Sequence, residues 1–416
     1  FYVHRDMGLV SEVFHSDVIK ELVGPTAIGH VRYSTTGESS PINAQPLVFN
    51  FAKGEIAIAT NGNLVNAAQL RCKLEEDGSI FQTTTDTEVI AHLIACSKAA
   101  SFEEAVKEAL NQLVGAYALL ILTNEQLFVA QDPHSLRPLS MGRLGEAYVF
   151  SSETCAFDTI GAEPIREIEP GELLVLKNGE MKVTRFAPPA RKAVCSFEYI
   201  YFARPDSDIN GINVHAARKR LGRMLAKEAP VDADVVTGVP DSSISAAIGF
   251  AEATGIPYEL GLIKNRYVGR TFIQPSQELR EQGVKLKLSA VRKVVAGKRV
   301  VMVDDSIVRG TTSRRIVNLL REAGAKEVHV RISSPPVKNP CFYGIDTANR
   351  EQLIASNSSV EEIRQAIQAD SLAFLSAEGM IEAITGSKSP QHGQCLACFN
   401  GDYPTVIEPY VLEGKV

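Results

Sequence analysis

The chain has 416 residues, is 45% hydrophobic and carries a formal net charge of −6. This length exceeds that of one typical hydrophobic core, so we expect two or more domains. The acidic balance argues against a nucleic-acid-binding surface, no apolar run has the length of a membrane helix, and seven cysteines are too few for a secreted disulfide framework, so we expect a cytoplasmic protein.

The first half of the chain predicts a mainly antiparallel sheet. Its opening residues, FYVHRDMGLV, do not form a secretory signal, and Phe1 is not an initiating residue, so we expect the true start to be missing. From residue 27 to about 186, short apolar runs alternate with turn residues, as in EIAIATNGNL and AYALLILTNEQLFVAQD. Helices such as 86–97 are expected to pack on this sheet. The stretch FAPPARKAV, residues 186–194, contains two prolines and predicts a domain boundary.

After about Cys195 strands alternate with helices. A strand is predicted at 234–237, followed by a helix that ends at Gly255. KRVVMVDD predicts a second strand, TSRRIVNLLREAG a helix ending at Gly324, and EVHVRISSPP a third strand. This alternation is typical of a parallel sheet covered by helices.

The stretch VVMVDDSIVRGTTSRR, residues 300–315, places polar groups where a buried strand gives way to a helix. Open α/β sheets bind ligands at such strand ends, and the N–H groups of a helix start favour an anion. Two carboxylates repel phosphate, so they are expected to face sugar hydroxyls and Mg²⁺. The pattern predicts a sugar-phosphate and metal site at Asp304, Asp305, Ser306, Gly310, Thr311, Thr312 and Ser313. The alternative is a solvated Asp-Asp turn before an ordinary helix cap.

Two further stretches suit an anionic ligand. TGVPDSSIS, residues 237–245, is a second strand-to-helix loop, with Asp241, Ser242 and Ser243 available for a second phosphate group. IKNRYVGRTFIQPSQ, residues 263–277, has no acidic residue and predicts a basic lid through Lys264, Arg266 and Arg270. The alternative is a basic surface loop without a ligand.

Residues 300–313 resemble the phosphoribosylpyrophosphate motif of the type I phosphoribosyltransferases, and nearly the whole chain resembles the glutamine phosphoribosylpyrophosphate amidotransferases. The resemblance implies that Asp304 and Asp305 hold the ribose hydroxyls and Mg²⁺, with Ser242 near the metal. It also implies that 306–313 bind the 5-phosphate and that PDSS, residues 240–243, binds pyrophosphate. The implied reaction is displacement of pyrophosphate from ribose C1 by ammonia, the first committed step of purine synthesis.

Three stretches of the first half, GHVRYSTTG, NGNL and TTTDTEV, resemble the N-terminal-nucleophile (Ntn) glutaminase domain. The resemblance implies that Arg32 and Asp86 bind the α-carboxylate and α-ammonium of glutamine, and that Asn61 and Gly62 form the oxyanion hole. From the residues alone, the Asn-Gly pair could equally form a hairpin turn, and the two charges could lie on the surface. The family usually has histidine where this chain has Thr60.

The nucleophile of that family is an N-terminal cysteine whose own amino group acts as the base. The first cysteine here is Cys72, within a predicted helix, so we expect that the sequence as given lacks the nucleophile and part of the glutaminase domain. On this expectation the chain makes phosphoribosylamine from ammonia and not from glutamine.

Four cysteines form a second candidate metal site: Cys195, Cys341, Cys395 and Cys398. Spacing alone leaves zinc, an iron–sulfur cluster, a redox pair and plain thiols open. The family resemblance implies a [4Fe–4S] cluster on these four in one branch. The remaining cysteines, Cys72, Cys96 and Cys155, are expected to be packing residues.

The predicted fold is therefore an α+β Ntn glutaminase sandwich over 1–190, followed by an α/β type I phosphoribosyltransferase domain with a cluster-binding C-terminal segment over 191–416. The resemblance further implies a homotetramer and feedback by purine nucleotides. Two alternatives remain from the sequence: a phosphoribosylpyrophosphate-sensing regulator without catalysis, and a phosphoribosyltransferase that uses only free ammonia.

Overall fold

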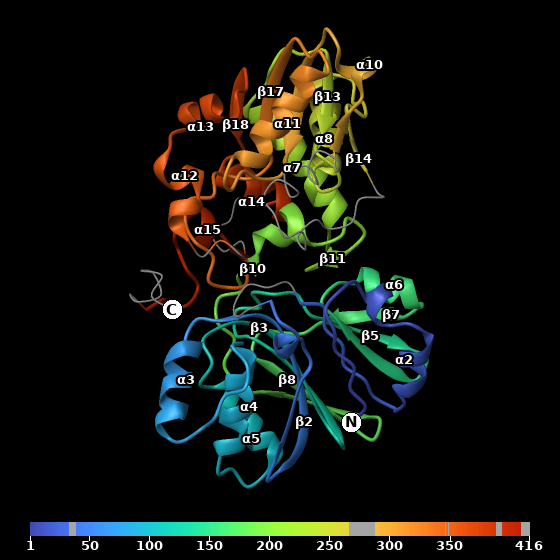
Figure 1. The fold of residues 1–416 in the computed structure, drawn as a ribbon, viewed down its shortest axis with the longest axis vertical. Coiled ribbons are helices and arrows are strands. Elements are labelled where there is room, and N and C mark those ends of the chain that lie inside the picture. The colour runs from blue at the N-terminus through green and yellow to red at the C-terminus, as the bar shows by residue number, and fades with distance from the viewer. Residues whose placement is uncertain (33–38, 266–287, 346, 348, 388–392, 409–416) are drawn as a thin grey trace. The chain divides into compact units, whose positions relative to one another are not determined.

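The computed structural model describes residues 1–32, 39–265, 288–345, 347, 349–387 and 393–408. Contacts within the chain divide it into two compact units (Figure 1). The first unit comprises Phe1–Val194, Cys341–Ala348 and Tyr403–Val416, and the second comprises Cys195–Pro340 and Asn349–Asp402. No helix of the described residues is both long and apolar enough to cross a membrane.

The first unit contains the predicted antiparallel sheet, with strands in the order β1-β2-β3-β4-β8-β9, and a second sheet in the order β6-β5-β7. Side chains of β3 alternate between two cores, as the period of a strand requires. Leu119 and Ile121 pack with the helices α4 and α5, whereas Ala118 lies in a core with Met141 and Leu174 that joins the two sheets. The predicted helix at 86–97 is present as α4 and covers one face of the larger sheet.

The elements of the first unit have the following bounds. The larger sheet contains β1 (Leu47–Phe51), β2 (Gly54–Leu64), β3 (Gly115–Thr123), β4 (Gln126–Gln131), β8 (Glu172–Lys177) and β9 (Glu180–Arg185). The smaller sheet contains β5 (Ser140–Leu144), β6 (Ala147–Ser151) and β7 (Glu163–Glu167). The helices are α1 (Val10–Val13), α2 (Ser16–Glu21), η1 (Pro41–Asn43), α3 (Ala67–Glu76), α4 (Thr87–Cys96), α5 (Phe102–Leu110) and α6 (Cys155–Ile160).

The second unit contains a parallel sheet in the order β13-β16-β17-β18, as the strand–helix alternation predicted. One face of this sheet buries Val300, Met302 and Val330 against α11 and α13. The predicted helix end at Gly255 is confirmed, because this residue caps α8 with a φ of 74°. The strand β18 was not predicted from the sequence.

The elements of the second unit have the following bounds. Its parallel strands are β13 (Val235–Gly238), β16 (Arg299–Asp304), β17 (Glu327–Ile332) and β18 (Ser371–Phe374). Its helices are α7 (Val214–Glu228), α8 (Ile244–Thr254), α10 (Arg292–Val295), α11 (Thr311–Glu322), α12 (Ile354–Asn357), α13 (Val360–Ile367), α14 (Ala377–Thr385) and α15 (Ala397–Asn400). The short elements are β10 (Val194–Cys195), η2 (Glu198–Phe202), β11 (Asp208–Ile209), β12 (Ile212–Asn213), β14 (Leu262–Lys264), β15 (Leu288–Ala290), η4 (Arg350–Gln352) and β19 (Gln394–Cys395).

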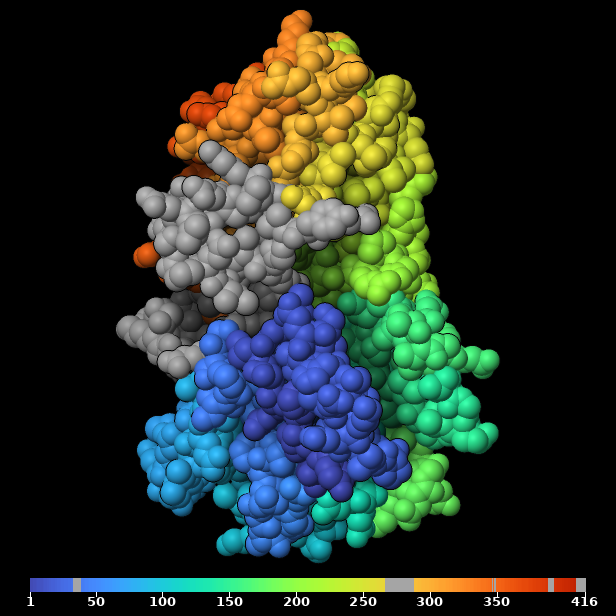
Figure 2. All heavy atoms as spheres, turned by 45° about the vertical axis from the view of Figure 1, so that its right-hand side comes forward, coloured from blue at the N-terminus to red at the C-terminus, as the bar shows by residue number. Residues whose placement is uncertain are grey.

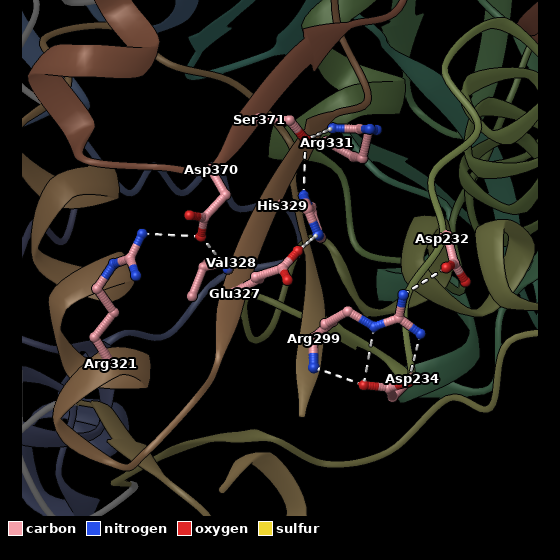
Figure 3. Close-up of polar contacts among 10 residues, drawn as sticks. All are labelled: Asp232, Asp234, Arg299, Arg321, Glu327, Val328, His329, Arg331, Asp370 and Ser371. Carbon is pink, nitrogen blue, oxygen red and sulfur yellow. Dashed lines mark hydrogen bonds and ion pairs between the residues drawn. The ribbon is translucent and has the colours of Figure 1, made fainter. Parts of the chain in front are cut away.

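Charged side chains close the amino end of the parallel sheet (Figure 3). Arg299, the first residue of β16, donates from Nη2 to Asp234 Oδ1 at 2.8 Å and pairs with Asp232 as well. Asp370, just before β18, accepts from Val328 N at 2.6 Å and from Arg321 at 2.9 Å. These charged groups form hydrogen bonds and ion pairs with one another. Ligands of parallel α/β sheets bind at the opposite, carboxyl end of the strands.

The N-terminal residues of the chain spread over the surface of the first unit (Figure 2, blue). Tyr2 is 68% exposed and Ile19 is 57% exposed, so this segment contributes little to the core.

Candidate active site

The two predicted carboxylates lie where β16 ends, in the second unit. Asp304 is the last residue of the strand and Asp305 follows it, and they are only 7% and 8% exposed. Burial, followed by the charge of Asp305, raises the pKa of Asp304 to about 8. Burial also raises the pKa of Asp305, against the lowering effect of hydrogen bonds from Ser242 and Ser306. The solvated-turn interpretation of these two residues is therefore wrong.

Hydroxyl groups from a second loop reach these carboxylates. Ser242 Oγ donates to Asp305 Oδ2 at 2.5 Å, and Ser243 Oγ donates to Asp304 Oδ1 at 3.1 Å. The two loops meet because β13 and β16 are parallel neighbours, so their carboxyl ends lie at the same edge of the sheet. Ser306 Oγ donates to Asp305 Oδ1 at 2.7 Å. The structure thus brings Ser242, Asp304 and Asp305 together as predicted.

The start of α11 provides an anion-binding position beside the carboxylates. Gly310 caps this helix with a φ of 78°, a conformation that favours glycine. Thr311 and Thr312 are exposed in the first turn, whereas Ser313 is buried. The unpaired N–H groups of a first helical turn and the helix dipole both favour a phosphate here.

The predicted basic lid is described only at its first residues. Lys264, at the end of β14, pairs through Nζ with Asp241 Oδ2 at 2.6 Å, so a cation of the lid meets the second loop. The peptide bond between Pro240 and Asp241 is cis. Arg266 and Arg270 lie outside the described residues.

The predicted oxyanion-hole residues of the first unit lie inside a strand. Asn61 and Gly62 belong to β2 and pair with Ala118 and Tyr117 of β3, so the hairpin-turn interpretation is wrong. Gly62 has a φ of 140°, and a Cβ atom there would lie 2.0 Å from the carbonyl oxygen of Ala116. Only glycine fits this position, because the neighbouring strand is too close for any side chain.

Asp86 and Arg32 lie near this strand. Asp86 is the N-cap residue of α4, but its side chain makes no cap hydrogen bond. Its Oδ2 accepts a hydrogen bond from the backbone N–H of Leu64, the last residue of β2, at 2.9 Å. Burial raises the pKa of Asp86, whereas backbone hydrogen bonds and the charge of Arg32 lower it. The charge of Arg32 is the smallest of these effects on Asp86, and the clamp stays a prediction.

Two side chains near this strand had no predicted role. Ser152 accepts a hydrogen bond from Asn61 Nδ2 at 3.5 Å, and His30 Nε2 lies 3.1 Å from the carbonyl oxygen of Thr60. His30 belongs to the GHVRYSTTG stretch, so the motif could have indicated it. Ser152 is distant in sequence from every quoted motif, and no local signal marks it.

The four predicted cluster ligands divide between the units: Cys341 belongs to the first unit, and Cys195, Cys395 and Cys398 belong to the second. Cys395 and Cys398 are buried. Ser196, next to Cys195, donates from Oγ to the carbonyl oxygen of Cys395 at 2.8 Å, which brings these two chain segments together. Across the part of the chain that the structure describes, no group of three or more His, Cys, Asp or Glu side chains is gathered as metal ligands. Both metal sites therefore stay predictions.

The remaining cysteines differ from the expectation. Cys155 is buried, as a packing residue should be, but Cys72 and Cys96 are exposed. Cys72 lies on α3 and Cys96 ends α4, each on a side of its helix that faces away from the core. The packing role expected for these two is wrong.

Comparison with known proteins agrees with this arrangement. Residues 30–159 match a family described as a glutamine amidotransferase domain, and residues 212–333 match one described as a phosphoribosyl transferase domain. The fold and the two sites therefore define a phosphoribosyl transferase that carries a glutamine amidotransferase domain.

Full-length relatives give the family. The chain is 63% identical over 406 residues to the amidophosphoribosyltransferase of Bacillus subtilis, covering 97% of this chain and 85% of the relative. It is 51% identical to that of Archaeoglobus fulgidus, covering 97% and 88%. A solved glutamine phosphoribosylpyrophosphate amidotransferase from B. subtilis, in complex with ADP and GMP, superposes with a TM-score of 0.92 at 62% identity, covering 98% of this chain and 89% of that one. The chain belongs to the amidophosphoribosyltransferase family.

Proposed function

We propose that this enzyme transfers ammonia from glutamine to 5-phosphoribosyl 1-pyrophosphate, giving 5-phosphoribosylamine, pyrophosphate and glutamate at the start of purine synthesis. The observation that carries the proposal is the meeting of two strand-to-helix loops through Ser242 and Asp305, at 2.5 Å, beside the start of α11. A sugar phosphate with a second phosphate group needs both loops at once. The family and both domains support the same reaction.

Each group at the phosphoribosyl site has a distinct task. The carboxylates of Asp304 and Asp305 accept hydrogen bonds from the ribose hydroxyls, and the start of α11 holds the 5-phosphate. The loop at residues 240–243 holds the departing pyrophosphate, where negative charge grows in the transition state. Lys264 and the lid residues Arg266 and Arg270 neutralise the same charge and exclude water that competes with ammonia.

The donor set fits Mg²⁺. Two buried carboxylates and the hydroxyl of Ser242 are hard oxygen ligands. Burial, and after it the charge of Asp305, raises the pKa of Asp304, and a bound cation would offset both effects. When bound, Mg²⁺ supplies Lewis-acid stabilisation of the pyrophosphate. Asp304, Asp305 and Ser242 would hold it.

In the glutaminase domain, Arg32 and Asp86 orient the two charged ends of glutamine. The Gly62 N–H and the Asn61 side-chain amide donate to the carbonyl oxygen of the amide as it becomes an oxyanion. The backbone of Gly62 is fixed against β3, because Gly62 pairs with Tyr117 and an added Cβ atom would lie 2.0 Å from the carbonyl oxygen of Ala116. Attack on the amide carbon by the family's cysteine nucleophile would form a thioester and release ammonia, and water would then hydrolyse the thioester to glutamate. The ammonia released is the nucleophile for ribose C1.

A second metal proposal concerns the four cysteines. Cys395 and Cys398 are buried two residues apart, and the Cys195 segment is tied to Cys395 through Ser196. With Cys341 they would hold a [4Fe–4S] cluster, which supplies structural cross-linking of the chain rather than a redox step. Purified protein should contain iron and sulfide in near-equal amounts, and Cys398→Ser should lower both. Zinc without iron after anaerobic purification would contradict the cluster.

A solved relative supports regulation by nucleotides. Because a relative was solved with ADP and GMP, we propose that purine nucleotides inhibit this enzyme as well. We also propose a homotetramer in the cytoplasm.

The decisive experiment measures pyrophosphate release with glutamine or with ammonium chloride. Asp305→Asn should lower both rates at least tenfold, a change of about 1.4 kcal/mol in the activation barrier. The control is Asp232→Asn, the same change on a side chain that is 87% exposed at the opposite end of the sheet. Unchanged rates in folded Asp305→Asn would exclude this site from the reaction. A wild-type protein that releases pyrophosphate with ammonium chloride but not with glutamine would support the alternative of a phosphoribosyltransferase that uses only free ammonia.

A further inference from the structure

A segment distant in sequence contacts β2 of the first unit. We call β2 the oxyanion strand, because it carries the proposed oxyanion-hole residues Asn61 and Gly62. Asn63, which follows Gly62 in β2, donates from Nδ2 to the carbonyl oxygen of Phe342 at 3.0 Å, across 279 positions of sequence. Gly344 lies against Gly62 itself, since a Cβ atom on Gly344 would come within 3.2 Å of the Gly62 carbonyl carbon and oxygen. We call residues 342–344 the strap.

Arg137 fixes the strap from its other side. Its side chain is only 5% exposed, and its Nε donates to the carbonyl oxygen of Tyr343 at 3.1 Å. A Cβ atom on Gly344 would also lie 3.0 Å from Arg137 Nη2. Gly344 has a φ of 103°, so both its conformation and its close neighbours favour glycine. The strap is thus held between a buried guanidinium and the backbone of Gly62.

The loop that carries Arg137 is anchored to the strand opposite Gly62. Asp132 is fully buried and accepts hydrogen bonds from the backbone N–H groups of His134 at 2.9 Å and Leu136 at 3.0 Å. It also accepts from Tyr117 N at 3.3 Å, and Tyr117 is the register partner of Gly62. Loop, strap and oxyanion strand therefore form one connected set of hydrogen bonds and contacts.

We propose that Arg137 and Gly344 are positioning residues for the oxyanion hole, which hold the backbone of Gly62 at the angle that the developing oxyanion requires. This inference rests on the proposed glutaminase role of Gly62. A misplacement of about 1 Å in a reacting geometry can slow a reaction about 100-fold. Both residues act through Gly62 and should affect the glutaminase step, while the phosphoribosyl step with added ammonia does not need them.

The test compares Arg137→Gln and Gly344→Ala in the full protein. Each should lower kcat for glutamine at least tenfold and leave the KM for glutamine and the ammonia-dependent rate within twofold of wild type. A KM-preserving loss distinguishes positioning of the transition state from general disruption of the glutamine site. The matched controls are Arg185→Gln, which removes a side-chain bond to the Pro170 carbonyl, and Gly179→Ala, at a φ of 82° with open space around it.

A second measurement does not depend on turnover. Hydrogen exchange of residues 60–64 should accelerate at least tenfold in both variants and in neither control, because the strap no longer restrains this strand. Unchanged glutamine kcat in both variants, or unchanged exchange of 60–64, overturns the inference. A wild-type protein that uses ammonia but not glutamine overturns the proposed glutaminase role instead, and the exchange data then decide whether the strap positions this strand.

Discussion

Glu88→Gln should destabilise the loop at residues 82–86, which carries the proposed glutamine ligand Asp86, in a pH-dependent way. The carboxylate of Glu88 is fully buried and accepts hydrogen bonds from Gln82 N at 2.8 Å and Thr83 N at 2.6 Å, just before Asp86. Burial alone raises the pKa of Glu88, but hydrogen bonds from His92, Gln82 and Thr83 outweigh it and lower the pKa from 4.5 to about 2. A glutamine amide has only one oxygen, so one of the two backbone N–H groups loses its acceptor.

The size of the effect follows from two routes. The lowered pKa of Glu88, from 4.5 to about 2, corresponds to at most about 3 kcal/mol. Leaving one buried N–H without an acceptor costs about 1–3 kcal/mol. We therefore expect a loss of about 2 kcal/mol in the free energy of local opening at pH 7.

The sign of the pH dependence is set by the lowered pKa. The folded-state pKa of Glu88 lies below its ordinary value of 4.5, so its stabilisation is complete above pH 4.5 and is lost as the pH falls through about 2. Hydrogen exchange of residues 82–96 at pH 7 and pH 3 measures the stabilisation that the Glu88 carboxylate provides. The control is Glu76→Gln, the same change at an exposed side chain. An equal difference between wild type and Glu88→Gln at both pH values would refute the charge-based explanation.

Three further outcomes are expected. Gly62→Ala should lower glutamine-dependent activity at least about 100-fold with the ammonia-dependent rate retained, because the added methyl group displaces the oxyanion strand; a retained glutamine rate would refute this in the same assay. Ser242→Ala, which removes one hydrogen bond to Asp305, should slow pyrophosphate release about 3- to 10-fold, and an unchanged rate would exclude Ser242 from the site. Hydrogen bonds from Arg299 lower the pKa of Asp234 to about 2, so Asp234→Asn should lower the urea midpoint at pH 7, and the two midpoints should converge as the pH falls from 3.8 towards 2; a constant gap would count against the pairing.

Several elements, and the position of Asp304 and Asp305 at a strand end, could be predicted from sequence because their signals are local. The apolar run before Asp304 predicts a buried strand by itself, and glycine at 255 ends a helix by its own backbone freedom. The meeting of Ser242 with Asp305 was also accessible, since parallel strands bring their carboxyl ends to one edge.

Other features depend on which distant residues become neighbours. The residue types of Asn61 and Gly62 are compatible with either a turn or a strand. Their pairing with Ala118 and Tyr117 of β3 makes them part of a strand. The side chain of Asp86 makes no cap hydrogen bond to α4. Its carboxylate instead accepts a hydrogen bond from the backbone N–H of Leu64 at the end of β2. The strap at 342–344 lies beside Asn63 across 279 positions, and no periodicity or motif encodes a contact at that separation. Local propensity and motif chemistry therefore determined the elements and the phosphoribosyl loops, whereas packing between distant segments decided how the oxyanion strand is held.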